Sequence, residues 1–168
     1  MWERLSEFVR VCWRGAWYQQ AVIALVALAS LAVSQERPPL FEGIGAHKFK
    51  VTTTSPEAQD YFNQGLVLSY GFNHNEAQRA FEYAAALDPE CAMAYWGAAY
   101  VLGPNLNQRM SPGDSEKARA LAVKALAKLD DETEVERALV VAVQKRYEDG
   151  VERKDADVNY ANAMREVA

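Results

Sequence analysis

One pattern of small and aromatic residues recurs after 34 positions in this chain, and it constrains the fold more than any other feature of the sequence. The pattern occupies Ala58, Tyr61, Gly65 and Leu68 in the first copy and Ala92, Tyr95, Ala99 and Leu102 in the second. Spacings of three and four residues place side chains on one face of an α-helix. Self-similarity at a fixed period of this length is typical of helical repeat architectures. The chain is therefore predicted to be all-α, with its helices paired into antiparallel hairpins.

Helix start and stop signals divide the second part of the chain into three such hairpins. Ser55 or Thr54 is expected to cap the first helix. Gly71 is expected to end that helix, and Pro89 to end the second one. The helical domain is predicted at 57–168, with hairpins at 57–88, 91–129 and 133–168.

Small side chains would allow these helices to pack closely. Gly65, Ala77 and Ala99 stand where neighbouring helices would cross, and small residues at a crossing permit a close approach. The spacing of the small and aromatic positions resembles a tetratricopeptide (TPR) repeat. That resemblance implies a short superhelix of hairpins. Gln64 departs from the pattern, because the repeat usually has an apolar residue at this position.

A longer run carries a more specific resemblance. Residues 45–49 are GAHKF, and residues 58–97 are AQDYFNQGLVLSYGFNHNEAQRAFEYAAALDPECAMAYWG. This run is similar to the amino-terminal part of a group of exported bacterial TPR proteins, over roughly residues 39–168. Members of the group tend to be several times longer than this chain and their biochemical function is largely unassigned, so the resemblance implies an architecture and no mechanism. Their leader often has a doubled His, whereas here His47 is followed by Lys48, which argues against a metal site.

Residues 1–34 are predicted to be an export segment. Three arginines precede an uncharged apolar stretch over residues 21–33, and this order is typical of a cleaved secretory signal peptide. The alternative is a retained membrane anchor, because residues 2–16 have the spacing of an amphipathic helix and the uncharged run that starts at Trp17 would span about 25 Å as a helix. Both alternatives place the rest of the chain outside the cytoplasm. It would be periplasmic, either free or tethered to the inner membrane through residues 2–33.

The segment that follows, residues 35–56, is predicted to be extended because it contains paired prolines, close glycines and a run of threonines. The alternation of Phe49 and Val51 leaves room for one short strand. We refer to residues 35–56 as the leader.

Charge and composition argue against several classes of function. The 18 basic and 23 acidic residues leave a net charge of −5, so no basic surface for nucleic acid is expected. Two Cys and two His are too few for a zinc site of the usual kind, and the thiol of Cys91 is expected to be buried. The sequence has no Gly-rich phosphate loop and no recognisable catalytic triad context. We therefore expect no enzyme activity, no cofactor and no metal.

The TPR resemblance also implies which side chains would face a ligand. In such an array the first helix of each hairpin lines a concave groove. The predicted partner-binding residues are Gln59, Phe62, Leu66, Ser69, Tyr70, Met93, Trp96 and Tyr100. A groove of this aromatic, weakly polar kind suits an extended peptide or an amphipathic helix. The alternative is that these aromatic residues pack against the leader or the next repeat, in which case Trp96 belongs to the core.

The sequence thus predicts a non-catalytic module for protein–protein interaction or assembly, acting outside the cytoplasm on a protein or peptide partner. Two alternatives remain open at this point. The chain could be a membrane-anchored structural subunit of a larger complex, or the amino-terminal part of a longer enzyme whose active residues follow Ala168.

Overall fold

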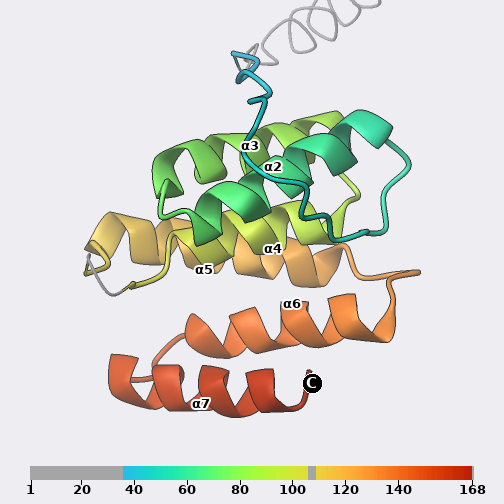
Figure 1. Ribbon diagram of the computed structural model, residues 1–168. Coiled ribbons are helices and arrows are strands. Elements are labelled where there is room, and N and C mark those ends of the chain that lie inside the picture. Colours follow the sequence, from blue (N-terminus) through green and yellow to red (C-terminus); the bar gives the residue numbers. More distant parts are fainter. Residues whose placement is uncertain (1–35, 106–108, 168) are drawn as a thin grey trace, which may run out of the picture. The chain divides into compact units, whose positions relative to one another are not determined.

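A computed structural model describes residues 36–105 and 109–167 of the protein (Figure 1). The export segment predicted at residues 1–34 lies outside these described residues. Within them the structure has six helices and no strand, which confirms the all-α prediction. The helices are α2 (Pro56–Tyr70), α3 (His74–Leu87), α4 (Ala92–Val101), α5 (Pro112–Ala127), α6 (Glu134–Arg146) and α7 (Arg153–Arg165). None of the helices in the described ranges is long and apolar enough to cross a membrane.

Side-chain caps set the start of three helices. The Ser55 hydroxyl accepts the Ala58 N–H at the start of α2, and the Ser111 hydroxyl accepts the Asp114 N–H at the start of α5. Each of these helices also has a proline in its first turn, where no intrahelical N–H partner is needed. Helix α6 begins with a reciprocal capping box in Thr133-Glu134-Val135-Glu136. Capping residues that precede apolar runs therefore determine where these helices begin.

Residues 37–168 form one compact unit, and consecutive helices within it pack in pairs. The most extensive contacts join α2 to α3, α4 to α5 and α6 to α7, and α3 also packs on α4. Short turns connect the helices of each pair where the structure describes the connection, so the partners run antiparallel (Figure 1). Helix α6 makes smaller contacts with α4 and α5.

The ring of Phe81 on α3 fills the space where α2 and α4 come close. A Cβ on Gly65 of α2 would lie 2.8 Å from the Phe81 ring, and a Cβ on Gly97 of α4 would clash with the same ring. Ala77 and Ala99 are fully buried. The small residues thus permit the close approach expected at Gly65, while the equal importance of Gly97 is a finding of the structure.

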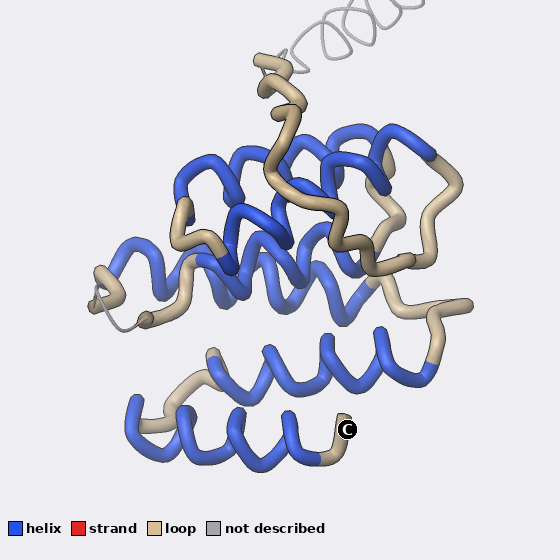
Figure 2. Tube along the Cα trace, viewed as in Figure 1, coloured by secondary structure: helices blue, strands red, loops and turns tan. Residues whose placement is uncertain are grey.

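The leader is extended without forming a strand, and it lies along α2 (Figure 2). Polar side chains of α2 bind its main chain in place of a neighbouring strand. Gln64 accepts the Phe41 N–H at 2.7 Å and donates to the Pro39 carbonyl at 2.9 Å. This pair of hydrogen bonds explains why a polar residue stands at position 64, where the repeat pattern would have an apolar one.

Candidate functional site

The leader and four helices surround a cavity of about 310 Å³. We call it the aromatic cavity. Its wall consists of His47, Phe49, Phe62, Leu66, Tyr70, Met93, Trp96, Tyr100, Val135, Leu139, Tyr160, Met164 and Val167. Six of the eight residues predicted to bind a partner are in this wall, and the exceptions are Gln59 and Ser69.

The predicted groove is largely covered in the structure. Phe62 and Met93 have no exposed surface, and Trp96 is only 6% exposed. Tyr70 remains 62% exposed at the edge of the aromatic cavity, and Tyr100 is partly buried. The leader and the pair α6–α7 supply the covering residues, since both contribute to the wall. The surface is therefore a partly enclosed cavity that stays open to solvent at Tyr70.

Sequence reasoning did not assign to this site the leader residues His47 and Phe49, nor the residues contributed by α6 and α7. Val135 and Leu139 are four residues apart, a spacing that predicts one shared helix face and is a usable signal. The sequence carried no signal that this face packs on α4 and borders the same cavity as α2, because contacts between hairpins depend on how successive pairs stack.

Aromatic rings stack along one side of the aromatic cavity. The rings of Trp96 and Tyr100, one helical turn apart on α4, are parallel to within 5° with centroids 5.3 Å apart. The centroids of the Phe62 and Trp96 rings are 6.5 Å apart, and those of Phe49 in the leader and Phe62 are 6.4 Å apart. Offset and tilted arrangements at these distances are favourable for aromatic pairs. This side of the wall is thus a continuous surface of packed aromatic rings.

Tyrosine hydroxyls provide polar groups at the same cavity. Burial raises the pKa of Tyr100 and of Tyr160, so both hydroxyls stay protonated. Neither hydroxyl forms a hydrogen bond with any residue that the structure describes. Arg146 lies over the ring of Tyr160, with its guanidinium carbon 4.9 Å from the ring centroid. The hydroxyls of Tyr100 and Tyr160 are therefore free to bind a ligand.

The two predicted residues outside the wall have other contacts. The Gln59 amide accepts the Val51 N–H and donates to the Phe49 carbonyl, both at 2.9 Å. Asn63 accepts the Phe49 N–H at 3.1 Å. The Ser69 hydroxyl donates to the Leu66 carbonyl of its own helix at 2.7 Å, so it does not face a partner. Gln59 does bind an extended chain, and in this structure that chain is the leader.

Two buried carboxylates hold the end of the leader. Glu136 of α6 accepts the Thr52 N–H at 2.6 Å and the Thr52 hydroxyl at 2.9 Å. Asp88 accepts the Thr53 hydroxyl at 2.5 Å and the Thr54 N–H at 2.9 Å. Burial alone would raise the pKa of each carboxyl, but the hydrogen bonds outweigh it and lower both pKa values. Both groups are therefore ionised and bound at neutral pH.

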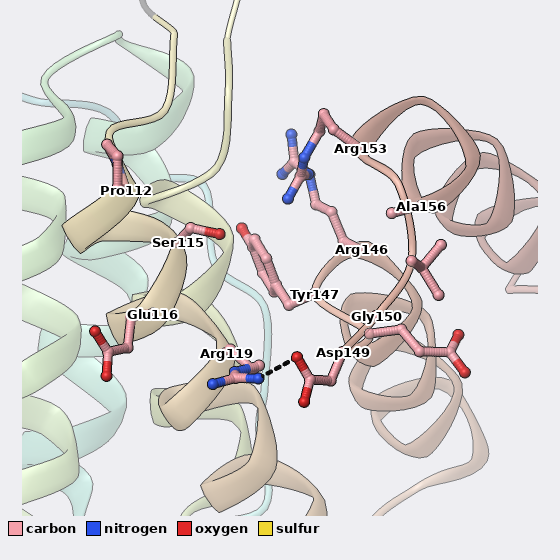
Figure 3. Close-up of a pocket in the computed structure, with 12 residues that line it drawn as sticks. Pro112, Ser115, Glu116, Arg119, Arg146, Tyr147, Asp149, Gly150, Arg153 and Ala156 are labelled. Atoms are coloured by element: carbon pink, nitrogen blue, oxygen red, sulfur yellow. Dashed lines mark ion pairs between the residues drawn. The ribbon is translucent and has the colours of Figure 1, made fainter.

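A second cavity, of about 490 Å³, lies beside α5 and the turn before α7 (Figure 3). Its wall includes the basic residues Arg119, Arg146 and Arg153. Three acidic residues, Glu116, Glu148 and Asp149, share that wall. Arg119 is paired with Asp149 at 2.5 Å, as the dashed line in Figure 3 marks. Because the charges balance, this cavity has no excess positive charge that would select an anion.

Metal and thiol chemistry find no site in the described residues. No three His, Cys, Asp or Glu side chains there are placed to hold a metal ion. Cys91 is 2% exposed, and burial raises the pKa of its thiol to about 11, so it stays protonated and inert. Its burial agrees with the sequence-based expectation.

This chain matches no protein-family model, no curated protein and no solved structure.

Proposed function

We propose that this protein is a non-catalytic, exported binding module whose helix pairs form a TPR-like superhelix. Its aromatic cavity and the adjoining face of α2 bind an extended segment of a partner polypeptide. The recurrence of the small residues, the antiparallel pairing and the close contact between Gly65 and Phe81 support the proposed superhelix. The wall of the aromatic cavity supports the proposed binding surface, because it gathers six of the residues selected from sequence alone.

The observation that carries the proposal is how α2 holds the leader. Gln59 makes paired hydrogen bonds to the main chain at Phe49 and Val51, which are the groups that a neighbouring strand would bind. Such bonds recognise an extended chain whatever its side chains are, and adjacent pockets then supply specificity. The leader is thus an extended segment bound by the same chain, and a partner segment is expected to continue along the same face into the aromatic cavity.

A selection from a random peptide library tests this proposal. The full-length protein in mild detergent is immobilised, and the enriched peptides are synthesised and titrated against the purified protein by calorimetry. We expect enrichment of peptides that bind the wild type and bind Tyr100→Ala at least tenfold more weakly.

Tyr95→Ala is the matched control, because Tyr95 is on the same helix and lies outside the wall of the aromatic cavity. It should bind the selected peptides like the wild type. If the folded wild type enriches no peptide, or if both tyrosine variants bind equally well, the proposal is wrong.

A further inference from the structure

The aromatic cavity has the size and chemistry of a side-chain specificity pocket. We propose that it takes a single uncharged aromatic ring with a polar edge, of the tyrosine type, carried by the bound polypeptide. This inference rests on the proposed function, since it names the side chain that the bound segment would insert.

The volume of the cavity sets the size of the occupant. The cavity is partly open to solvent at Tyr70, and its volume of about 310 Å³ limits how much of a ligand can be buried in it. An engineered apolar cavity of about 150 Å³ is enough to bind benzene. The aromatic cavity therefore has room for one substituted ring and its linking atoms, and it is too small for a helix.

The wall excludes charge. None of its thirteen residues is Asp, Glu, Lys or Arg, and the sole ionisable nitrogen base among them is His47. Transfer of an ionised group into such surroundings without a partner is very costly. The parallel rings of Trp96 and Tyr100 offer a flat face against which another ring packs favourably. The thioethers of Met93 and Met164 also pack well against aromatic rings.

The two free hydroxyls select a polar edge on that ring. Tyr100 comes from α4 and Tyr160 from α7, so they approach the cavity from different helices. A hydroxyl without a protein partner can donate to, or accept from, a phenolic oxygen. A phenol would satisfy these groups, whereas a phenyl ring would leave them without a hydrogen bond when it excludes water. Tyrosine is therefore preferred to phenylalanine.

The leader shows that an extended segment can deliver a ring to this place. Phe49 lines the aromatic cavity while its N–H and carbonyl are held by Asn63 and Gln59. The main chain of the leader is thus bound to α2 at Phe49, whose side chain lines the aromatic cavity. Because Asn63 and Gln59 are already bound to the leader, a partner segment would insert its tyrosine beside Phe49 with its own main chain outside the leader.

Small ring compounds test the pocket without any peptide. Four tryptophans occur in the chain, so replacing Trp2, Trp13 and Trp17 by Phe leaves Trp96 as the sole reporter of fluorescence. The full-length protein with these substitutions is titrated with p-cresol, toluene and 4-methylbenzoate. We expect saturable changes in Trp96 emission, with p-cresol binding at least threefold tighter than toluene and at least tenfold tighter than 4-methylbenzoate.

Two variants assign the binding to the cavity. Tyr160→Phe should reduce the preference for p-cresol over toluene, because the Tyr100 hydroxyl alone remains, and it should leave toluene binding unchanged. Leu139→Trp should fill the cavity and abolish binding of both compounds, detected by ligand-observed NMR, while Leu126→Trp, at a 45% exposed position on α5, should retain it.

The inference is overturned if the folded protein binds none of the three compounds, if 4-methylbenzoate binds as tightly as p-cresol, or if Tyr160→Phe leaves the preference for p-cresol unchanged. Selected peptides that still bind in that case would leave the proposed function standing without this pocket. Ring binding without any peptide binding would overturn the proposed function, while the selectivity of the cavity would stand.

Discussion

Helices α2–α5 and the pair α6–α7 are held in place by different kinds of contact. In the first group, rings and small residues interlock, and Phe81 is fully buried between Gly65 and Gly97. In α7 the buried residue is Ala156 alone. Helix α6 adds the buried side chains of Val140 and Val143 to the same core, and hydrogen bonds from Thr52 to Glu136 and from the Tyr147 hydroxyl to the Ala99 carbonyl also attach it.

This difference means that the residues that stabilise the fold are not all of the residues that shape the aromatic cavity. Regions with few buried apolar contacts open at lower free energy than a close-packed core. The fixed wall of the aromatic cavity, which includes Trp96, belongs to the interlocked group, and the wall made by Leu139 and Tyr160 belongs to the less buried pair. Because Ala156 is the one buried residue of α7, we expect the side of the cavity that includes Tyr160 to open at lower free energy than the core.

The core of the first group gives the largest expected effect. Phe81→Ala removes a fully buried ring from between two helices and should lower the free energy of unfolding by about 3–5 kcal/mol. Urea denaturation followed by circular dichroism measures this change. Phe72→Ala, at a 58% exposed position, makes the same chemical change and should cost less than about 0.5 kcal/mol. Equal losses in the two variants would contradict the distinction between the groups.

The attachment of α6 gives a smaller effect. Glu136→Gln keeps the shape of the side chain but removes the charge that accepts hydrogen bonds from Thr52 and Thr133, and it should cost about 1.5–3 kcal/mol at pH 7. Glu134→Gln is the control, because Glu134 is exposed in the first turn of the same helix. Its effect should stay below about 0.5 kcal/mol.

The same pair of variants has a defined pH dependence. Folding lowers the pKa of Glu136 from its ordinary value of 4.5, so its stabilising contribution is complete above pH 4.5 and is lost as the pH falls through the folded pKa. The difference in unfolding free energy between wild type and Glu136→Gln should therefore shrink between pH 5 and the most acidic pH at which the protein remains folded. A difference that stays constant, or grows, over this range would contradict the ionised state of Glu136.

The two groups also differ in how far the sequence predicts them. Repeating small residues such as Gly65 predict the all-α class and the first helices, since local spacing determines which face is buried. The TPR resemblance selects the residues that α2 and α4 contribute to the aromatic cavity. It does not select the other half of the aromatic cavity, because Tyr160 reaches it only through the way the third helix pair stacks. Nor does spacing indicate that Gln64 binds a leader about 25 residues earlier in the chain.

Gln64 allows a test of the leader itself. Gln64→Leu restores the apolar residue of the repeat pattern and removes the hydrogen bonds to Pro39 and Phe41, so it should cost about 1 kcal/mol. Hydrogen exchange measured by NMR should show faster exchange of the Phe41 amide. The Val51 amide, which Gln59 binds, serves as the internal control and should exchange at its wild-type rate. Faster exchange at both positions would mean that the leader detaches as one unit.

The ion pair between Arg119 of α5 and Asp149, in the turn before α7, should give the smallest effect although it joins the two groups directly (Figure 3). Asp149 is 86% exposed, and a pair in water is screened, so Arg119→Ala should change the unfolding free energy by about 0.2–1 kcal/mol. The change should fall further in 1 M salt, where the screening length is about 3 Å. A loss above about 2 kcal/mol, or one that salt does not reduce, would show that the charged turn contributes more to the attachment of α6–α7 than its exposure allows.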